Sequence, residues 1–414
     1  MSAERAKVVV IGAGFGGLRA ARALRGADVD VILIDRCNYH LFQPLLYQVA
    51  TAGLGPDQIS YPVRAILRRQ RNVAFRMTEV TGVDLDRRAV LTTSGAVPYD
   101  FLIFAAGAET NFFGMEGVRK HALNLKGISD AIAIRNHVLR RFEEAVLEGD
   151  PAIRRALLTF VVAGGGPTGV ETAGALSELI RLVLRKDYPR LDLNDVRIVL
   201  LETGPRILSV MPVDLSSAAV TSLAEKHVEV LCGRSVADFD GARVTLKEGE
   251  AIASRTLIWA AGVRAVDLAM ALGVPSGAHG RIPVEPGLQL KGHPEVFVIG
   301  DAAYLESGGL PLPMMAPVAI QMGATASENI KRALRGEKPL AFRYKDPGSL
   351  ATIGRDSAVA FIGGRRFSGL TAWIVWLVVH LIQLIGFRNR LIVLINWAWD
   401  YFLYERAVRV ITGE

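Results

Sequence analysis

The sequence predicts an α/β fold in which two similar strand–helix domains are followed by a helical C-terminal segment. Three observations indicate this class. A glycine-rich turn joins an apolar strand to a helix near the N-terminus, and a second turn of the same kind recurs in the middle of the chain. The composition then changes near the C-terminus, where four of the five tryptophans lie at or after Trp373.

The first glycine turn has the arrangement of a dinucleotide-binding loop. Val8–Ile11 is a predicted buried strand, Gly12–Gly17 is a G-x-G-x-x-G turn, and Leu18–Leu24 has a helical pattern. In such a loop Gly12 makes the turn, Gly14 admits a pyrophosphate and Gly17 lets helix and strand pack closely. The phosphates then lie at the positive end of the helix. Asp35 ends the next strand, about 20 residues on, where a carboxylate can bind ribose.

The second glycine turn repeats this order. Leu158–Ala163 is a predicted strand, Gly164–Gly169 is the turn, Val170–Leu184 is a predicted helix, and the following strand ends in Glu202. Because a carboxylate accepts hydrogen bonds from a ribose 2′-hydroxyl and repels a 2′-phosphate, Glu202 favours NADH over NADPH.

A second pair of similar segments follows the turns at matched spacing. Leu102–Gly107 resembles Leu257–Gly262, so the first glycine precedes the last by 95 residues in one copy and by 98 in the other. Matched motifs at matched spacing indicate an internal repeat. We therefore predict two Rossmann-like dinucleotide-binding domains, one for a tightly held flavin and one for a diffusing nicotinamide.

Four further features are candidates for the chemistry. Glu171 lies in the first helical turn after the second glycine loop; it either faces the nicotinamide or merely complements the helix dipole. Asp301 ends a buried strand and is a candidate for holding the ribityl chain of a flavin. A helix starting near Ala316 would direct its positive end at the flavin ring, although an ordinary core helix is the alternative. The apolar loop Asn38–Tyr47 either packs on the flavin or belongs to the core.

Composition excludes several classes of function. The net charge of +7 is compatible with anionic lipid or a dinucleotide, and the chain has no recognisable nucleic-acid-binding module. Cys37 and Cys232 are the only cysteines, so a disulfide framework and a C-x-x-C redox centre are both excluded. The seven histidines show no metal-ligand spacing, and we predict no metal site. The N-terminus has no export signal.

The C-terminal segment suggests a lipid-soluble electron acceptor. Leu370–Phe387 carries no formal charge, and Trp373, Trp376, His380 and Gln383 share one helical stripe. This pattern is typical of a helix lying in a membrane interface. A single transmembrane span and a buried core or dimer helix are the alternatives.

Taken together, the motifs resemble the type II NADH dehydrogenases, which are single-subunit NADH:quinone oxidoreductases. The resemblance runs almost from end to end and depends most on these segments: GAGFGG, YHLFQPLLYQVAT, GGGPTGVE, LIWAAGVR, VFVIGDAA, APVAIQMG and SLATIGR followed by GFRNR. It implies a glutathione-reductase-like fold and an FAD-dependent enzyme that passes two electrons from NADH to a membrane quinone without pumping protons. It also implies a monotopic membrane anchor.

The resemblance assigns residues to each site. We expect non-covalent FAD to contact Gly12, Gly14, Phe15, Gly16, Gly17, Asp35, Arg36, Gln43, Val80, Gly107, Asp301, Ala316 and Pro317. We expect NADH to contact Gly164, Gly166, Pro167, Thr168, Gly169, Glu171, Glu202 and Gly262. Ile320 and Gln321 are the expected quinone contacts, and Glu171 matches the family's glutamate beside the nicotinamide and quinone sites.

Two positions depart from the family pattern. The quinone helix often reads A-Q-x-x-x-Q, whereas here Pro317 follows Ala316 and only Gln321 remains. Pro347 also replaces the lysine of a common D-K-G sequence. Sulfide:quinone reductases share the fold but need redox cysteines that this chain lacks. A flavoprotein that senses NADH without turning over quinone is the alternative from a different class, and a related reductase with a non-quinone acceptor is another.

These expectations define a domain plan. Residues 1–118 and 286–340 would form the FAD-binding domain, residues 119–285 the NADH-binding domain, and residues 341–414 the membrane-anchoring region. The expected setting is the cytoplasmic face of the cell membrane, as a peripheral or monotopic protein. A homodimer and an anionic bilayer are the expected partners besides NADH and quinone.

Overall fold

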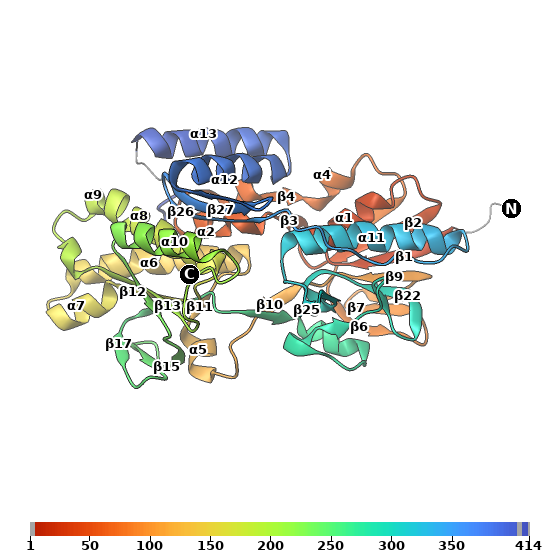
Figure 1. Cartoon of the computed structure of the whole chain (residues 1–414), viewed down its shortest axis with the longest axis horizontal. Coiled ribbons are helices and arrows are strands. Elements are labelled where there is room, and N and C mark those ends of the chain that lie inside the picture. The colour runs from red at the N-terminus through yellow and green to blue at the C-terminus, as the bar shows by residue number, and fades with distance from the viewer. Residues whose placement is uncertain (1–4, 404–407, 413–414) are drawn as a thin grey trace. The chain divides into compact units, whose positions relative to one another are not determined.

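The computed structural model describes residues 5–403 and 408–412, which form two compact units. The first unit contains the described residues up to Leu41, together with Ser60–Thr110 and Val263–Asp346. The second contains Phe42–Ile59, Asn111–Gly262 and the described residues from Pro347 onward. Each unit therefore holds one of the two glycine turns (Figure 1).

A six-stranded sheet forms the centre of the first unit. Its spatial order is β21 (Gln289–Leu290), β22 (His293–Val298), β9 (Phe101–Phe104), β1 (Ala6–Ile11), β2 (Val29–Asp35) and β5 (Val73–Met77). All neighbours are parallel except the edge pair β21 and β22. The apolar runs that the sequence places in strands are the buried centre of this sheet, as a parallel sheet covered by helices requires.

Helices α1 (Phe15–Ala23) and α11 (Ala316–Leu334) pack closely against each other in the first unit (Figure 1). A Cβ on Gly323 would lie 2.4 Å from the backbone oxygen of Gly16, so a side chain there would push the helices apart. The Ser327 hydroxyl donates to the Ala20 carbonyl at 3.0 Å. This packing ties the helix that follows the first glycine turn to the helix expected beside the flavin.

Smaller elements complete the first unit. They are β3 (Tyr39–Leu41), β4 (Ser60–Pro62), α4 (Val63–Leu67), β6 (Val80–Asp84), β7 (Ala89–Thr92), β8 (Gly95–Pro98), β10 (Ala108–Thr110), β19 (Val263–Ala265), η4 (Asp267–Leu272), η5 (Ala278–Gly280), β20 (Ile282–Pro283), η6 (Gly300–Ala302), β23 (Ala303–Tyr304), β24 (Glu306–Ser307) and β25 (Leu310–Pro311).

A five-stranded parallel sheet forms the centre of the second unit. Its order is β11 (Leu123–Asn124), β18 (Thr256–Trp259), β12 (Thr159–Ala163), β13 (Arg197–Glu202) and β14 (Val228–Cys232). A three-stranded sheet, β15 (Val236–Phe239), β16 (Arg243–Leu246) and β17 (Ala251–Ala253), shares an apolar cluster with one of its faces. Two parallel sheets of similar topology confirm the predicted repeat.

The helical elements of the second unit surround that sheet and extend into the C-terminal segment. They are η1 (Gln43–Leu45), α2 (Leu46–Ala50), α3 (Pro56–Ile59), α5 (Glu116–His121), α6 (Ile128–Leu147), α7 (Pro151–Leu157), α8 (Pro167–Glu178), a π-helical turn at Leu179–Leu184, α9 (Arg185–Asp187), η3 (Leu193–Asp195), α10 (Val213–Glu225), α12 (Gly369–Gln383) and α13 (Phe387–Leu403).

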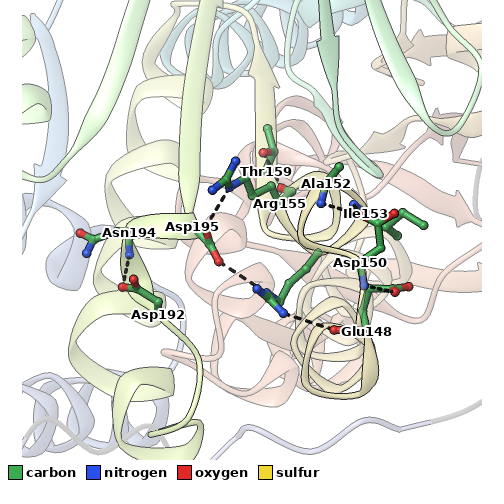
Figure 2. A network of polar contacts seen from close by, with 10 residues as sticks. Glu148, Asp150, Ala152, Ile153, Arg155, Thr159, Asp192, Asn194 and Asp195 are labelled. Carbon is green, nitrogen blue, oxygen red and sulfur yellow. Dashed lines mark hydrogen bonds and ion pairs between the residues drawn. The ribbon is translucent and has the colours of Figure 1, made fainter.

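A network of polar contacts fixes α7, the helix that leads into β12. Figure 2 shows the Asp150 carboxylate accepting from the backbone N–H groups of Ala152 and Ile153, at 2.7 and 3.4 Å. Such capping satisfies donors that the first turn of a helix leaves without partners. Arg155 also reaches Asp195, with 3.0 Å between guanidinium nitrogen and carboxylate oxygen. The network therefore sets where β12, and the glycine turn after it, begins.

The C-terminal segment belongs to the second unit through a small sheet. β26 (Ser349–Gly354), β27 (Ser357–Ile362) and β28 (Arg365–Ser368) form antiparallel pairs, and α8 packs on β26 while α12 packs on β27. A Cβ on Gly174 of α8 would lie 2.5 Å from the Ile353 backbone oxygen. The absence of a side chain at Gly174 therefore allows α8 to approach the backbone of β26.

The tryptophan stripe of α12 is mostly turned toward the interior of the second unit. Trp376 is 1% exposed, and Trp373 and His380 are half-buried, whereas Gln383 is exposed. The opposite face of α12 is aliphatic and exposed. It carries Leu370, Ile374, Val378 and Ile382. The aromatic stripe is thus part of the core of the second unit, because indole rings find packing and hydrogen-bond partners there.

Helix α13 also exposes apolar side chains. Leu391, Leu394, Ile395, Trp399 and Phe402 are all exposed. Arg390 donates to the carbonyls of Leu384 and Ile382, at 2.7 and 2.6 Å, and so caps the end of α12. Across residues 5–403 and 408–412, we find no helix with the length and apolar character needed to cross a membrane.

Most predicted elements are present, with shifted ends. The helix predicted to start near Ala316 is α11, which begins at Ala316. The helix predicted over Val170–Leu184 is α8 up to Glu178, followed by the π-helical turn. The compact units also divide the chain differently from the predicted domain plan, since Phe42–Ile59 groups with the second unit.

The close approach at Gly174 leads to a stability prediction. Gly174→Ala should destabilise the protein by about 1–3 kcal/mol, because the new Cβ would overlap the Ile353 carbonyl and α8 would have to move. The urea midpoint of unfolding measures this. Gly149→Ala is the control, since a Cβ there meets no atom within 4 Å. Equal midpoints for the two variants would contradict the prediction.

Candidate active site

The two glycine turns have the same geometry. Gly12 N–H donates to the Ile34 carbonyl at 2.7 Å, and Gly164 N–H donates to the Leu201 carbonyl at 2.8 Å. Gly12 and Gly164 have φ of +96° and +110°, a left-handed conformation that favours glycine. The agreement extends the repeat from the sequence pattern to the backbone.

The repeated Ala-Ala-Gly segments explain why both turns need glycine. A Cβ on Gly12 would lie 2.4 Å from the Ala105 oxygen, and a Cβ on Gly164 would lie 2.5 Å from the Ala260 oxygen. In each copy the segment ending in Gly107 or Gly262 therefore lies directly against the first glycine. The matched spacings of 95 and 98 residues reflect this contact.

The middle glycine of each turn is open, as phosphate binding requires. A Cβ on Gly14 or Gly166 would meet no atom within 4 Å. Gly14 is the N-cap of α1 and Gly166 is the N-cap of α8, with Pro167 at the first helical position. The N–H groups of both helix starts are thus available to an anionic group.

Each turn is also held by a carboxylate, a feature that sequence reasoning missed. One oxygen of Asp35 accepts from the Ala13 N–H at 2.7 Å, and the other accepts from the Cys37 N–H at 2.7 Å. In the second unit, one oxygen of Glu202 accepts from the Gly165 N–H at 2.7 Å and the other accepts from the Gly204 N–H at 2.6 Å. Each oxygen of Asp35 and Glu202 keeps a second lone pair, so binding a ribose remains compatible with this role.

His40 contacts the first glycine turn through both a hydrogen bond and its ring. Its Nδ1 lies 2.9 Å from the Ala13 carbonyl, so the Nδ1–H donates to it. Its ring also meets Phe15 edge-to-face at 5.1 Å between centroids. Burial lowers the pKa of His40, which keeps the imidazole neutral. The sequence placed His40 in an apolar loop but gave no sign of this contact.

Glu171 lies in the first two turns of α8 and is buried in the second unit. Its Oε1 accepts from the Thr352 backbone N–H and from the Trp376 indole N–H, both at 3.3 Å. Burial raises its pKa to about 8, although both hydrogen bonds act to lower it. Desolvation outweighs these hydrogen bonds because their 3.3 Å distances are long. Glu171 is therefore largely protonated near neutral pH.

A cavity of about 110 Å³ adjoins the donors of Glu171. Thr352 and Trp376 belong to its lining. Its other aromatic lining residues are Tyr47, Trp373, Trp397 and Tyr401, and its charged ones are Glu178, Arg355 and Asp400. The guanidinium of Arg355 stacks on Tyr401 at 3.8 Å from the ring centroid. The cavity is thus an aromatic space with charged groups in its lining.

The remaining predicted flavin contacts are divided between the units. Asp301 lies in η6, which packs against α11, the helix that begins with Ala316 and Pro317; there the Gly300 N–H donates to the Met322 sulfur at 3.2 Å. Arg36, Val80 and Gly107 also belong to the first unit, whereas Gln43 belongs to the second. There the Gln43 amide donates to the Lys126 carbonyl at 3.2 Å.

The predicted quinone contacts lie in the first turns of α11. The Gln321 amide is engaged at both ends, since its Nε2 donates to the Lys345 carbonyl at 2.8 Å and its Oε1 accepts from the Lys345 N–H at 3.0 Å. Ile320 is half-buried beside it. Among residues 5–403 and 408–412, no group of three or more histidine, cysteine, aspartate or glutamate side chains could hold a metal ion.

Known proteins with similar sequences identify the family. The profile of the pyridine nucleotide-disulphide oxidoreductases matches residues 6–323, and that of the NDH2 C-terminal domain matches residues 347–406. The chain is 41% identical to the type II NADH:quinone oxidoreductase Ndh of Mycobacterium tuberculosis, over 99% of this chain and 91% of that protein. The chain belongs to the type II NADH:quinone oxidoreductase family. The Staphylococcus aureus member is 32% identical, over 90% of this chain and 93% of its own.

Solved structures confirm the fold. Plasmodium falciparum NDH2 in complex with NADH superposes with a TM-score of 0.90 at 21% identity, covering 99% of this chain and 100% of that one. The sulfide:quinone oxidoreductase of Aquifex aeolicus gives a TM-score of 0.73 at 20% identity, covering 97% and 96%. The predicted glutathione-reductase-like α/β fold, with a helical C-terminal domain, is therefore correct for this type II NADH:quinone oxidoreductase family member.

Proposed function

We propose that this protein oxidises NADH and reduces a membrane quinone through FAD, in a two-electron reaction without proton pumping. The observation that carries the proposal is the pair of carboxylate-held glycine turns, one in each unit, in a chain that belongs to the type II NADH:quinone oxidoreductase family. Two dinucleotide sites allow an electron donor and a resident cofactor to be bound at once.

The residues of the first unit fit FAD. The open Gly14, the α1 N-terminus and the Asp35 carboxylate suit a pyrophosphate and a ribose, and Asp301 is the candidate partner of the ribityl chain. When bound, FAD supplies the acceptor for the hydride of NADH and the donor of electrons to quinone. The N-terminus of α11, with Ala316 and Pro317, would place a positive helix end beside the flavin.

The second unit provides the proposed NADH site. The Gly164–Gly169 turn and the α8 N-terminus would bind the pyrophosphate, and Glu202 would accept from the adenosine ribose. Glu202 already holds Gly165 and Gly204, so its carboxylate is fixed before the ligand arrives. The 2′-phosphate of NADPH would lie against the negatively charged Glu202 carboxylate and be repelled by it.

Glu202 should therefore make the enzyme prefer NADH over NADPH by about a hundredfold in kcat/KM, equivalent to ~3 kcal/mol. Glu202→Ala should lower the ratio of kcat/KM for NADH to kcat/KM for NADPH. Steady-state kinetics with both cofactors measure it, and Glu229→Ala is the control because Glu229 lies on the neighbouring strand in a surface ion pair with Arg197. Equal use of both cofactors by the unaltered enzyme would refute this assignment.

Glu171 is the proposed catalytic residue. It follows the NADH loop directly, and as a protonated acid near neutral pH it can orient the nicotinamide and supply a proton to quinone. Ile320 and Gln321 are the proposed quinone contacts, and a carbonyl of the quinone would compete with Lys345 for the Gln321 amide. The aromatic cavity next to Trp376 also suits an apolar ring.

Glu171→Gln should retain FAD and slow turnover by at least ~10-fold, or ~1.4 kcal/mol of barrier, because the amide cannot release a proton. Turnover of the unaltered enzyme should also fall as the pH rises above about 8, where Glu171 becomes a carboxylate. Rates of NADH oxidation with a quinone across pH test both points. Glu225→Gln, an exposed change on α10, should leave the rates unaltered.

We further propose that the protein binds the membrane as a peripheral or monotopic protein, with α12 and α13 as the contact. We call the exposed apolar residues of α12 and α13 together the apolar tail surface: Leu370, Ile374, Val378, Ile382, Leu391, Leu394, Ile395, Trp399 and Phe402. Arg388 adds a positive charge beside it that favours anionic lipid. We also propose that the protein binds the cytoplasmic face of the membrane and that it forms a homodimer.

Replacing two residues of the apolar tail surface should release the protein from lipid. Val378→Glu with Ile382→Glu should weaken binding to anionic vesicles at least ~10-fold, because two side chains lose apolar burial and two carboxylates enter the interface. Sedimentation with vesicles measures binding. Leu147→Glu, at an 87% exposed apolar position on α6, is the control. Release by the control variant to the same extent would exclude α12 as the specific contact.

The overall function is tested by steady-state NADH oxidation with a short-chain quinone. We expect quinone-dependent turnover by the FAD-loaded protein. Binding of NADH and reduction of the flavin with negligible quinone turnover would instead identify an NADH-sensing flavoprotein.

A further inference from the structure

The surroundings of Glu171 give its two oxygens different roles. Both hydrogen-bond donors, the Thr352 N–H and the Trp376 Nε1–H, converge on Oε1. Oε2 accepts no hydrogen bond from the described residues. An oxygen that already accepts two N–H bonds is a poor site for a proton, because the added O–H would replace one of those bonds. The other oxygen is the better place for it.

Trp376 is itself held rigidly. Its ring is 1% exposed and stacks on His380 at 4.1 Å between centroids, with an interplanar angle of 24°. Trp397 lies 5.7 Å away and Tyr47 meets it edge-to-face at 6.4 Å. His380 Nδ1–H donates to the Trp376 carbonyl at 2.8 Å. Rings on three sides therefore fix the direction in which the indole N–H points.

We propose that Trp376 is a positioning residue that holds Glu171 through Oε1 and so keeps the transferable proton on Oε2. This inference deepens the proposed function and rests on it for the identity of the proton acceptor. The indole donor does not touch the substrates; it acts through Glu171.

The proton has a defined place in the reaction. NADH and quinone become NAD⁺ and quinol with the uptake of one proton. The hydride of NADH accounts for both electrons and one hydrogen, so the second hydrogen of the quinol comes from solvent. In the proposed step the Oε2–H bond of Glu171 breaks and an O–H bond to the quinone oxygen forms. Water then returns a proton to the Glu171 carboxylate.

The titration of Glu171 is governed by burial and these two donors. The titratable or charged side chains on α8, on the elements packed around this site and just after β26 are Tyr47, Glu178, Arg181, Arg197, Glu202, Glu229, Cys232, Arg355 and His380, with Lys226 paired to Glu178. None of them contributes to the shift in the pKa of Glu171. Burial holds His380 neutral by lowering its pKa to about 4. Loss of the indole donor should therefore raise the pKa of Glu171 further, because that hydrogen bond stabilises the carboxylate.

The test compares Trp376→Phe, which removes the N–H but keeps an aromatic ring, with the matched control Trp373→Phe. Trp373 lies one turn earlier on α12 and stacks on Tyr401 without bonding to Glu171. The titration of Glu171 is followed in the FAD-loaded protein, without NADH, from its carboxylic C=O infrared band. Glu171→Gln identifies that band by removing it.

Trp376→Phe should raise the apparent pKa of Glu171 by about 0.5–1 unit. The alkaline fall in quinone-dependent turnover should move by the same amount, and Trp373→Phe should leave the infrared titration of Glu171 unchanged. An unchanged infrared titration in Trp376→Phe would overturn the proposal. Because the infrared measurement needs no quinone, a shifted titration with no quinone turnover would retain the role of Trp376 and reject the proposed function.

His380→Leu provides a second variant in case Trp376→Phe fails to retain FAD. It keeps the indole donor but removes the ring stacked on it at 4.1 Å. The apparent pKa of Glu171 should then rise, but by less than in Trp376→Phe. No movement in a folded, FAD-loaded His380→Leu protein would contradict the claim that the aromatic packing orients the donor.

Discussion

The hydrogen bonds from each glycine turn to the carboxylate at the end of the next strand connect the fold to its function. Asp35 and Glu202 each accept two backbone N–H groups, one from the turn and one from the loop after the strand. Charge-assisted bonds of this kind are among the stronger ones in proteins. They hold the turn while its remaining N–H groups stay directed at an incoming phosphate. Because the same pair of hydrogen bonds occurs in both units, one repeated structural motif can provide both a flavin site and a nicotinamide site.

The C-terminal segment has two distinct faces with separate consequences. Its inner face supplies Thr352 and Trp376 to Glu171, and its outer face is apolar and exposed. Residues far apart in the sequence thus build the environment of one acid, and a glycine at position 174 lets them come close enough. The proposed membrane-binding surface and the proposed catalytic environment of Glu171 therefore share the single helix α12.

Periodicity and motif spacing predicted much of the fold, since the glycine turns, their strands and the helices α1, α8 and α11 follow from local pattern. The sequence placed Asp35, Glu202 and Glu171 next to the two glycine turns. It did not reveal the groups to which these carboxyl side chains are hydrogen-bonded. Thr352 lies 181 residues from Glu171 and Trp376 lies 205 residues from it, so no local pattern could pair them. The sequence left open which side of α12 the aromatic stripe faces, because aromatic residues at helical spacing suit both a membrane interface and a core. The Gln321 contact with Lys345 was equally out of reach of motif reasoning.

The proposed function requires one bound flavin to take electrons from NADH and pass them to a quinone. Anaerobic stopped-flow spectroscopy with two sequential mixes tests it most directly. NADH is mixed first, and a menaquinone or ubiquinone analogue second, while flavin absorbance is followed. We predict that the flavin is bleached by NADH and recovers with at least one quinone at a rate no slower than steady-state turnover. Bleaching by NADH with no recovery on that timescale, with either quinone, would contradict the account.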